Sequence, residues 1–551
     1  PAVLASGFNL TITSDIANLQ PTDLTNQGGF YPEVITDALD RATIQIQQLD
    51  QNNRAIKIPL SDGVLDMTTP VVAERANKYL AFDAAGLPVV SAGTGSDSAL
   101  RTDLANATAV SAGSRLSGFR QTGTGATART VDDKLKDTVS VKDFGSNLGV
   151  ALTALGATET TLIIDDDVTV SVNTTIPATL AIEVKKGSII TVNNAITLTV
   201  NGSFTAGIYS VFTYVGTGNV TFAKSSVDQM YPEWWGAVGD GSTSCTTAFT
   251  NLTKTVNSSG FGRLFFSGTQ YNFTPVISAV TCAFLNVTSF TMTGKSIIYD
   301  TTSSYSGTDT TTFIQFTTCS KIKIDSQLSF VSVPNISVAI NGLSWFKFLQ
   351  GCTYISGGGI FNGVLHCYMF YRLITESTSY ISKYANLNID ATSVYYPLMC
   401  NVSGEYINAN LVTTACGRSV FLNASGNHSK INIKQKNQVG ANIIGTYGTT
   451  SINALGVTDV ELSVVDRDST TNNLGIPVLF QFYNTFPATI SNIKVSIDVK
   501  NVLGTPVFSD SVAIWKLDNS QNPDTVGRGH QFKNIYISGI SDQAGTGYET
   551  I

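Results

Sequence analysis

The sequence predicts an all-β protein whose C-terminal half is a parallel β-helix, a column of stacked chain coils. The first observation is composition: charged residues make up 13% of the 551 and glycine numbers 47. The sequence has few charged residues and many uncharged polar residues among Val, Ile and Phe. This composition favours sheets with one buried and one solvent-exposed face over helices stabilised by ion pairs. The second is periodicity, because short alternating segments return along residues 229–551 at separations mostly in the twenties and thirties of residues, the scale of one solenoid coil.

Each of these segments alternates aliphatic and polar side chains. Successive side chains of a strand point to opposite faces, so we expect Ile, Leu and Val to line the column and polar residues to face water. Stacked coils then bury a continuous apolar core, and the backbone of each coil pairs with the next. The segments are 322–324, 387–389, 407–411, 431–433, 460–464, 493–497 and 535–537, with Lys323, Asn388, Asn432, Ser463, Ser496 and Tyr536 predicted to face outward.

Charge and hydropathy exclude two classes of partner. With 33 basic and 40 acidic residues the net charge is −7, so no global basic field exists to hold phosphate backbones and we expect no nucleic acid partner. No apolar run reaches the ~18 to 20 residues of a membrane-spanning helix, and Pro1 is followed by no charged-then-apolar leader. We therefore expect a soluble chain, a fragment or a processed product, with no membrane insertion.

The cysteines indicate buried thiols rather than disulfides or metal ligands. They number seven, are widely spaced and form no CxxC or Cys/His cluster of metal-ligand spacing. We therefore predict no metal and no cofactor, and folding in a reducing cytosol. The seven are Cys245, Cys282, Cys319, Cys352, Cys367, Cys400 and Cys416.

Composition divides the chain into four regions: 1–60 with a helix, 61–145, 146–228 and 229–551. Residues 61–145, rich in Gly, Ala, Thr and Ser, bury little by themselves and predict either a flexible linker or a thin extended shaft, of which we favour the shaft. Residues 146–228 alternate clearly between turn signals and predict a small all-β domain. Three adjacent carboxylates in that region, Asp165 to Asp167, are interpreted as a solvated turn rather than a cation site.

The helix of the first region carries a heptad seam. Apolar residues recur at alternating spacings of four and three after Pro32, which is acceptable in a first helical turn. One interpretation is a helix packed on its own domain; the other, which we favour, is self-association of parallel chains. The predicted seam residues are Ile35, Leu39, Ala42, Ile46 and Leu49.

Three motifs, in order, resemble parts of bacteriophage tailspikes and tail fibres from short-tailed phages. Residues 21–41 (PTDLTNQGGFYPEVITDALDR) with 45–49 (QIQQL) look like the later part of an N-terminal virion-binding adaptor. Residues 129–145 (RTVDDKLKDTVSVKDFG) resemble the segment that joins adaptor to body in such spikes. Residues 231–241 (YPEWWGAVGDG) match the opening motif of pectate-lyase-like β-helices in phage depolymerases. Together they cover about a tenth of the chain.

The resemblance implies a right-handed, pectate-lyase-like parallel β-helix in a homotrimer. It implies a virion protein, made in the host cytoplasm, that attaches to other phage tail proteins and recognises a bacterial capsule or lipopolysaccharide. Such proteins often cut the glycan as well. Residues 242–249 (STSCTTAF) depart from the family, because they lack the acidic residues of its "TDDTxAI" stretch. Asp240, in the Gly-Asp-Gly of the third motif, is therefore interpreted as a turn and cap residue.

Cutting would require particular side chains in the solenoid. A hydrolase needs two carboxylates about 5 to 9.5 Å apart, and a lyase needs a base such as Tyr, His or Lys with charge neutralisation of a uronate. Strand parity points Asp390 and Asp498 to solvent, whereas a turn with a local ion pair is the alternative for Asp466 and Asp468. The catalytic candidates are Glu376, Asp390, Glu405, Asp466 and Asp468.

Tyrosines offer a second route to sugars. They are dense between residues 366 and 396, and Tyr384, Tyr395 and Tyr396 are the predicted substrate-binding residues. The competing interpretation is that these rings stack inside the column or between subunits.

The residues leave two functions open, a receptor-binding depolymerase and a non-enzymatic adhesion fibre. A secreted pectate-lyase-like enzyme is disfavoured, because it would have no use for a virion adaptor.

Overall fold

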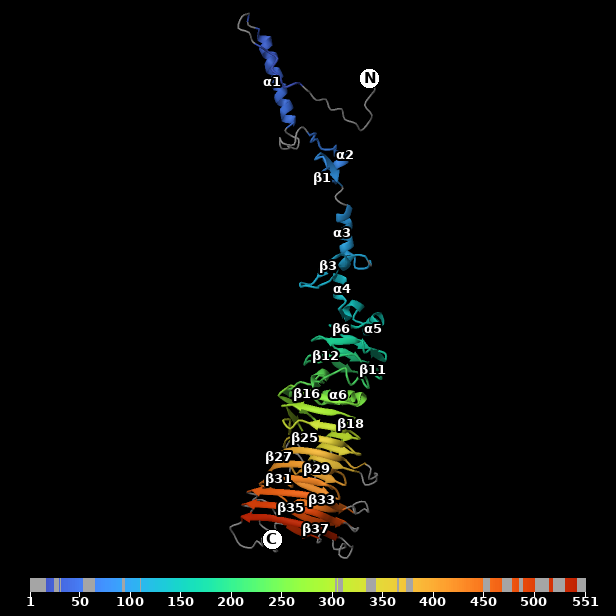
Figure 1. Cartoon of the computed structure of the whole chain (residues 1–551), viewed down its shortest axis with the longest axis vertical. Coiled ribbons are helices and arrows are strands. Elements are labelled where there is room, and N and C mark those ends of the chain that lie inside the picture. Colours follow the sequence, from blue (N-terminus) through green and yellow to red (C-terminus); the bar gives the residue numbers. More distant parts are fainter. Residues whose placement is uncertain are drawn as a thin grey trace. The chain divides into compact units, whose positions relative to one another are not determined.

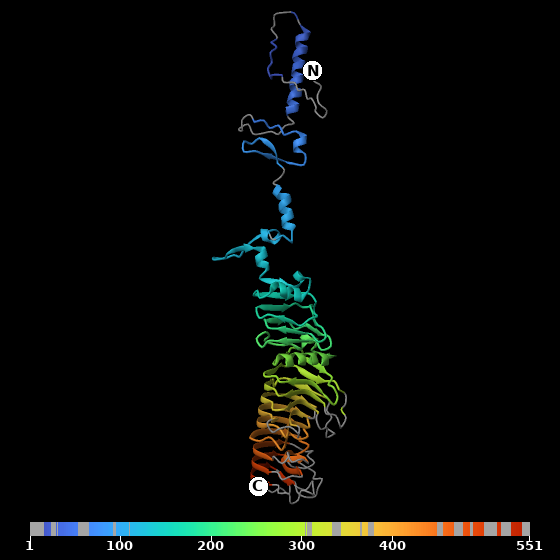
Figure 2. The same cartoon turned by 90° about the vertical axis from the view of Figure 1, so that its right-hand side faces the viewer.

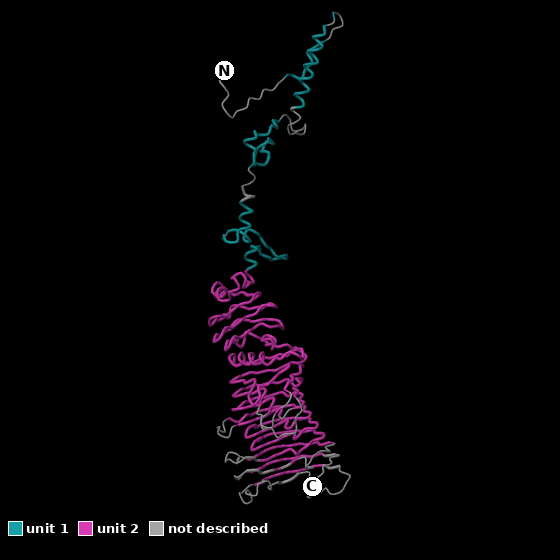
Figure 3. The backbone as a smooth tube through the Cα atoms, turned by 180° about the vertical axis from the view of Figure 1, so that it is seen from behind, with its two compact units in different colours: residues 1–135 teal, residues 136–551 magenta. Residues whose placement is uncertain are grey.

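The computed structural model shows a mostly β protein dominated by long parallel sheets. The described residues fall into two compact units, 1–135 and 136–551, drawn in two colours in Figure 3. The structure describes residues 16–23, 29, 31–52, 65–91, 95–109, 111–302, 305, 311–332, 343–363, 366–372, 380–448, 456–467, 478–484, 489–500, 515–518 and 531–542.

The first unit consists of short local elements. Two antiparallel pairs, β1 with β2 and β3 with β4, are its sheets, so the region that the sequence predicted as a shaft contains hairpins and helical turns. The elements are α1 (Pro32–Asn52), α2 (Val72–Arg75), β1 (Tyr79–Phe82), β2 (Pro88–Ser91), α3 (Gly95–Ala105), η2 (Gly113–Leu116), β3 (Gly118–Arg120), β4 (Ala128–Thr130) and α4 (Val131–Leu135).

Helix α1 confirms the predicted helix, and its two sides differ. On one side Arg41 donates through Nε to the Leu19 carbonyl oxygen at 3.3 Å and through Nη2 to that of Ala17 at 3.1 Å, which fastens the preceding segment to the helix. On the seam, Leu39, Ile46 and Leu49 are each more than half exposed. The seam therefore does not pack on the described residues of its own chain.

The second unit begins with three coils of three strands each. Every coil adds one strand to each of three parallel sheets, ordered β12-β9-β6-β5, β13-β10-β7 and β14-β11-β8. The elements are β5 (Thr138–Ser140), η3 (Val141–Phe144), α5 (Leu148–Leu155), β6 (Thr160–Ile164), β7 (Val168–Val170), β8 (Thr174–Ile176), β9 (Leu180–Val184), β10 (Ile190–Val192), β11 (Thr197–Val200), β12 (Phe204–Ala206), β13 (Phe212–Tyr214) and β14 (Asn219–Phe222).

This arrangement bears on the boundaries near 145 and 228 that the sequence suggested. Strand β5 lies before the first boundary yet pairs with β6 beyond it. One hydrophobic core runs from Val141 to Ile497, across both boundaries. In these coils each strand pairs with the strand three further along the sequence. The alternation of apolar and polar residues does not reveal this pairing, so the same pattern suits a separate small domain or the first coils of a column.

The three adjacent carboxylates fasten the first coils together. Asp165 accepts a hydrogen bond from the Ser140 hydroxyl at 2.6 Å, and Asp167 accepts one from the Ile189 backbone N–H of the next coil at 2.8 Å. The Ser146 hydroxyl donates to Asp166 at 2.6 Å, and this bond is the main cause that lowers the pKa of that carboxyl. Each carboxylate thus has its own protein donor, in keeping with the predicted turn.

After η4 (Pro232–Trp235) and the helix α6 (Thr246–Ser259) the coils continue as two parallel sheets, stacked as Figures 1 and 2 show. The fourteen-stranded sheet contains β15 (Asp240–Ser244), β16 (Gly262–Phe266), β17 (Gln270–Phe273), β19 (Phe290–Gly294), β20 (Ile297–Asp300), β22 (Ser320–Ile324), β23 (Ser329–Val331), β25 (Thr353–Asn362), β27 (Lys383–Thr392), β29 (Glu405–Thr414), β31 (Ser429–Lys436), β33 (Val457–Arg467), β35 (Thr489–Lys500) and β37 (Gln531–Asp542). The nine-stranded sheet contains β18 (Val280–Leu285), β21 (Thr312–Thr317), β24 (Ser344–Leu349), β26 (His366–Tyr371), β28 (Tyr396–Asn401), β30 (Val420–Asn423), β32 (Asn442–Gly448), β34 (Val478–Asn484) and β36 (Trp515–Asp518).

Strand β25 is where a three-strand coil becomes a two-strand coil. Its first half pairs with β22 and its second half with β23, so one long strand replaces two. The bend between the halves consists of three glycines. A Cβ on Gly357 would lie 1.8 Å from the Ile324 carbonyl oxygen, and one on Gly358 would lie 1.6 Å from that of Asn388. Only glycine allows so close an approach between neighbouring coils.

The column interior matches the predicted alternation. Ile322, Ile324, Leu387, Ile389 and Ile431 are buried. The residues between them face outward, where amides form a ladder: Asn410 Nδ2 donates to Asn388 Oδ1 and Asn432 Nδ2 to Asn410 Oδ1, each at 3.0 Å. All seven cysteines are free and buried, as predicted. No helix among the described residues is long and apolar enough to cross a membrane.

We predict that two adjacent residues of β29 differ sharply in their effect on stability. Leu411→Ala removes a buried side chain from the column and should destabilise the unit by about 2–5 kcal/mol. Val412→Ala, on the exposed face of the same strand, should change stability by no more than about 0.5 kcal/mol. Urea unfolding of the two variants measures this, and equal shifts of the midpoint would contradict the register.

Candidate functional site

The predicted carboxylates that the structure describes occupy three different environments. Asp390 is exposed on the outer face of β27, as strand parity predicts. Glu405, at the start of β29, forms an ion pair with Lys383 (Nζ to Oε2, 3.0 Å), and this hydrogen bond is the main cause that raises the Lys383 pKa. Asp466 is buried, and its Oδ2 accepts a hydrogen bond from Gln435 Nε2 at 2.7 Å. Glu376 and Asp468 lie outside the described residues.

These three carboxylates are too far apart to act as a hydrolase pair. Asp390 aligns with Val412, seven residues beyond Glu405, which is roughly 23 Å along the strand at ~3.3 Å per residue. Asp466 lies three strands from Asp390 along the stack, about 14 Å at ~4.8 Å per strand, and it points inward. A hydrolase requires about 5 to 9.5 Å. The structure therefore does not bring the described candidates together.

The sequence placed Asp466 just past a strand, and this was wrong. Strand β33 continues to Arg467, so Asp466 falls on the inward side and joins a buried polar network. In that network Asn442 Nδ2 donates to Gln435 Oε1 at 2.8 Å, next to the bond from Gln435 to Asp466. Arg467 pairs with Asp498 of the next coil (Nη2 to Oδ2, 2.7 Å) rather than only with its own neighbours. Buried polar groups require such partners, so we assign Asp466 a structural role.

The main surface feature of the column is a row of stacked aromatic rings at one corner, which we call the corner ladder: Tyr354, Tyr384, Tyr406 and His428. The centroids of successive rings are 5.3, 5.1 and 4.8 Å apart, with interplanar angles of 17°, 26° and 19°. The three tyrosines are between 42% and 60% exposed. The ladder thus presents ring edges and hydroxyls from four successive coils to solvent.

The backbone fixes these side chains in one row. Each ladder residue has a positive φ, between 54° and 62°, and immediately precedes the inward-facing part of its strand. A residue in this left-handed conformation bends the chain locally, so these coils turn at the same place and their side chains leave at the same corner. Lys321, before the ladder, and Asp459, Asn492 and Asn534, after it, share this conformation.

Beyond His428 the same corner continues as a polar row. His428 Nδ1 lies 3.1 Å from Asp459 Oδ2. Asn492 Nδ2 then donates to Asp459 Oδ1 at 2.8 Å, and Asn534 Nδ2 donates to Asn492 Oδ1 at 2.9 Å. The corner therefore joins an aromatic stretch, whose rings offer apolar surface with polar tips, to an amide and carboxylate stretch. Rings of this kind can pack on CH groups, and amides and carboxylates can form hydrogen bonds with hydroxyl groups.

Tyr395 and Tyr396, predicted to bind substrate with Tyr384, lie on a different sheet. Tyr384 belongs to β27 of the fourteen-stranded sheet, whereas Tyr396 begins β28 of the nine-stranded one. Tyr395 and Tyr396 meet edge to face, 4.6 Å between centroids, and Tyr396 stacks on His366 at 5.3 Å. Arg418 Nη1 donates to the Tyr396 hydroxyl at 3.1 Å. Burial is the main cause that raises the Tyr396 pKa.

His366 in this second cluster is a buried neutral imidazole. Its Nδ1 has no hydrogen-bond partner in the structure. Burial, and secondarily the charge of Lys347, lowers the His366 pKa from 6.5 to about 3. An imidazole this weakly basic is a poor proton acceptor at neutral pH, so we assign His366 a structural role. Among the described residues no three of His, Cys, Asp and Glu are grouped closely enough to hold a metal ion.

Sequence reasoning missed three of the four ladder residues: Tyr354, Tyr406 and His428. The signal was present, because each tyrosine lies directly before an inward Ile or Ala at the start of a long strand. It was hidden because the number of residues in a coil varies. The register pairs Ile355 with Ala385 and Ala385 with Ile407, so no fixed period in the sequence connects the tyrosines.

No protein-family model, curated protein or solved structure matches the chain.

We predict that His366 makes the protein sensitive to acid. An unfolded imidazole takes up a proton near pH 6.5, whereas the folded one stays neutral down to about pH 3. The unfolded state therefore binds more protons in this window, and stability falls as pH falls, by at most about 1.4 kcal/mol per pH unit. His366→Gln should lose less stability than the parent between pH 7 and pH 4 in urea unfolding. The exposed His428→Gln is the control, and an unchanged pH dependence in His366→Gln would contradict the assignment.

Proposed function

We propose that this chain is one subunit of a homotrimeric bacteriophage tailspike that recognises a bacterial surface polysaccharide. Its column is then a right-handed parallel β-helix of the pectate-lyase type, and its N-terminal part attaches to other tail proteins of the virion. The corner ladder carries the proposal for recognition. Four stacked rings span three coil intervals, about 14 Å at ~4.8 Å each, which suits a short stretch of a linear polymer.

Two of the three sequence motifs support the proposal by the structures they form. Residues 138–144 of the second motif form β5 and η3 at the start of the first sheet, with a capping box between Ser140 and Asp143. The third motif forms η4, and its Asp240 accepts hydrogen bonds from the backbone N–H groups of Ser242 and Thr243, both at 2.8 Å. These bonds hold the Asp240 pKa well below its usual range. The second motif thus forms the first strand of the column, and the third lies just before the coils of the two long sheets.

The proposal is for recognition rather than cleavage. The described carboxylates lie apart and form no hydrolase pair, and His366 is buried and too weakly basic to serve as a lyase base. The self-association part is supported by α1, because a seam of exposed Leu39, Ile46 and Leu49 is more stable when parallel copies bury it. Threefold symmetry would close such an assembly.

We predict that ladder residues are needed for glycan binding. The double variant Tyr384→Ala and Tyr406→Ala should weaken binding of the purified polymer of a susceptible host at least tenfold, because two adjacent rings are lost. Surface plasmon resonance with immobilised polysaccharide measures this. Tyr536→Ala, an exposed tyrosine on β37 away from the ladder, is the matched control.

Two other outcomes would change the interpretation. Dissociation of the oligomer in the double variant, seen by light scattering, would mean that the ladder is a contact between subunits. Unchanged binding with an intact oligomer would remove the ladder from recognition. In the same samples, release of new reducing ends or absorbance from unsaturated uronates would show that the polysaccharide is cut, and its loss in the ladder variant would connect cutting to this corner.

We predict that the seam holds the N-terminal part of the trimer together. Ile46→Asp with Leu49→Asp would place like charges next to each other across parallel helices and should abolish crosslinking within residues 32–52. The column should keep its unfolding midpoint, because these residues belong to the other unit. Gln47→Asp with Gln48→Asp adds the same charge off the seam and serves as the control. Persistent crosslinking of the seam variant would disprove the seam.

A further inference from the structure

A separate pocket opens near the start of the column, on the rung between β12 and β16. It has a volume of about 350 Å³. It exists because residues 226–230, which occupy this rung, do not form a regular strand. The Phe204 N–H donates to the Ser226 carbonyl oxygen at 2.7 Å, and Met230 forms a single bridge with Leu264 of β16. Between these two points the wall of the column is incomplete.

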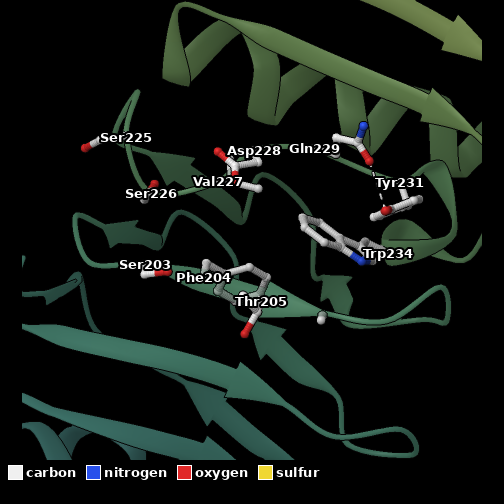
Figure 4. Close-up of a pocket in the computed structure, with 11 residues that line it drawn as sticks. Ser203, Phe204, Thr205, Ser225, Ser226, Val227, Asp228, Gln229, Tyr231 and Trp234 are labelled. Atoms are coloured by element: carbon white, nitrogen blue, oxygen red, sulfur yellow. Dashed lines mark hydrogen bonds between the residues drawn. The ribbon is translucent and has the colours of Figure 1, made fainter.

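The pocket places two exposed polar side chains, Asp228 and Gln229, beside aromatic residues of which Phe204 and Trp234 are buried. Figure 4 shows Asp228 and Gln229 on one side, Phe204 and Thr205 on the other, and the indole of Trp234 beside them. The indole is held in place because its Nε1 donates to the Gly207 carbonyl oxygen at 2.9 Å. Gln229 Oε1 accepts a hydrogen bond from the Tyr231 hydroxyl at 3.1 Å, which fixes the amide and leaves its nitrogen to donate elsewhere.

The charges of the lining select among ligand classes. Asp228 makes no hydrogen bond or ion pair with the described residues, and none of the residues that line the pocket is basic. A carboxylate without a cation disfavours uronates, phosphates and other anions. One carboxylate alone does not make a cation site, which needs several oxygen ligands. A carboxylate acceptor, an amide donor and nearby hydroxyls instead fit a neutral ligand that carries several hydroxyl groups.

We propose that this pocket binds a neutral sugar unit, as a second carbohydrate contact separate from the corner ladder. Sugar hydroxyls would donate to the Asp228 carboxylate and accept from Gln229 Nε2, beside the half-buried Tyr231. The pocket lies four rungs before β25, where the ladder begins, about 19 Å along the stack at ~4.8 Å per rung. This extends the proposed recognition of a polysaccharide and in that sense rests on it. A polymer that reaches both sites would bind more tightly than either site alone allows.

The test uses the full-length oligomer and saturation-transfer NMR with glucose, galactose, mannose, rhamnose, N-acetylglucosamine and glucuronate, each alone at millimolar concentration. At least one neutral sugar should bind and glucuronate should not. Asp228→Ala and Gln229→Ala should each weaken that neutral sugar at least tenfold. Asp228→Asn, which keeps one acceptor oxygen, should weaken it less. Glu159→Ala, which removes an exposed carboxylate elsewhere in the unit, is the control.

Three results would overturn the inference: no neutral sugar binds, glucuronate binds equally well, or the pocket variants bind like the parent. The variants change exposed side chains, and an unchanged thermal unfolding temperature confirms that each is folded. Failure of the inference is distinguishable from failure of the proposed function. If the ladder variant loses polymer binding while pocket variants change nothing, only the second site is wrong. If a neutral sugar binds the pocket but host polymer never binds, only the proposed function is wrong.

Discussion

In-register parallel pairing between successive coils is the constraint on which the rest of the structure depends. A coil cannot shift by one residue without moving its whole aliphatic row from the core to water. Equivalent side chains therefore stack directly on one another, inside as the continuous core and outside as the Asn388, Asn410 and Asn432 ladder. The corner ladder results from the same constraint, because the coils from β22 to β37 turn at a left-handed residue in the same register.

Two stacking patterns meet within one hydrophobic core, and each junction leaves a characteristic feature. At β25 one long strand replaces two strands of the preceding coil, and glycine is required where neighbouring backbones approach. Between β12 and β16 the chain does not complete a strand, and the pocket beside Trp234 opens there. Irregular rungs are thus where the column departs from a uniform wall, and they supply concave surface that a perfectly repeated stack does not have.

The sequence was sufficient for the all-β class with long parallel sheets and for the inward rows, because alternation of Ile, Leu and Val with polar residues suits a sheet with one buried face. Local pattern was insufficient where the answer depended on the length of an element or on pairing between distant residues. Asp466 was assigned to a turn because the strand was expected to end early. Helix α6 was not predicted, because its threonines have low helix propensity, although its Ala248, Phe249, Leu252 and Val256 form a buried face.

The buried thiols have a consequence for how the column comes apart. They are distributed from Cys245 to Cys416, and every one is inaccessible in the folded chain. Burial raises the pKa of Cys282 to about 12, so this sulfur stays protonated and unreactive. An alkylating reagent therefore labels each position only when its own part of the stack opens. The seven cysteines can therefore report local opening of the column. The order in which they are alkylated would show the order in which parts of the column unfold.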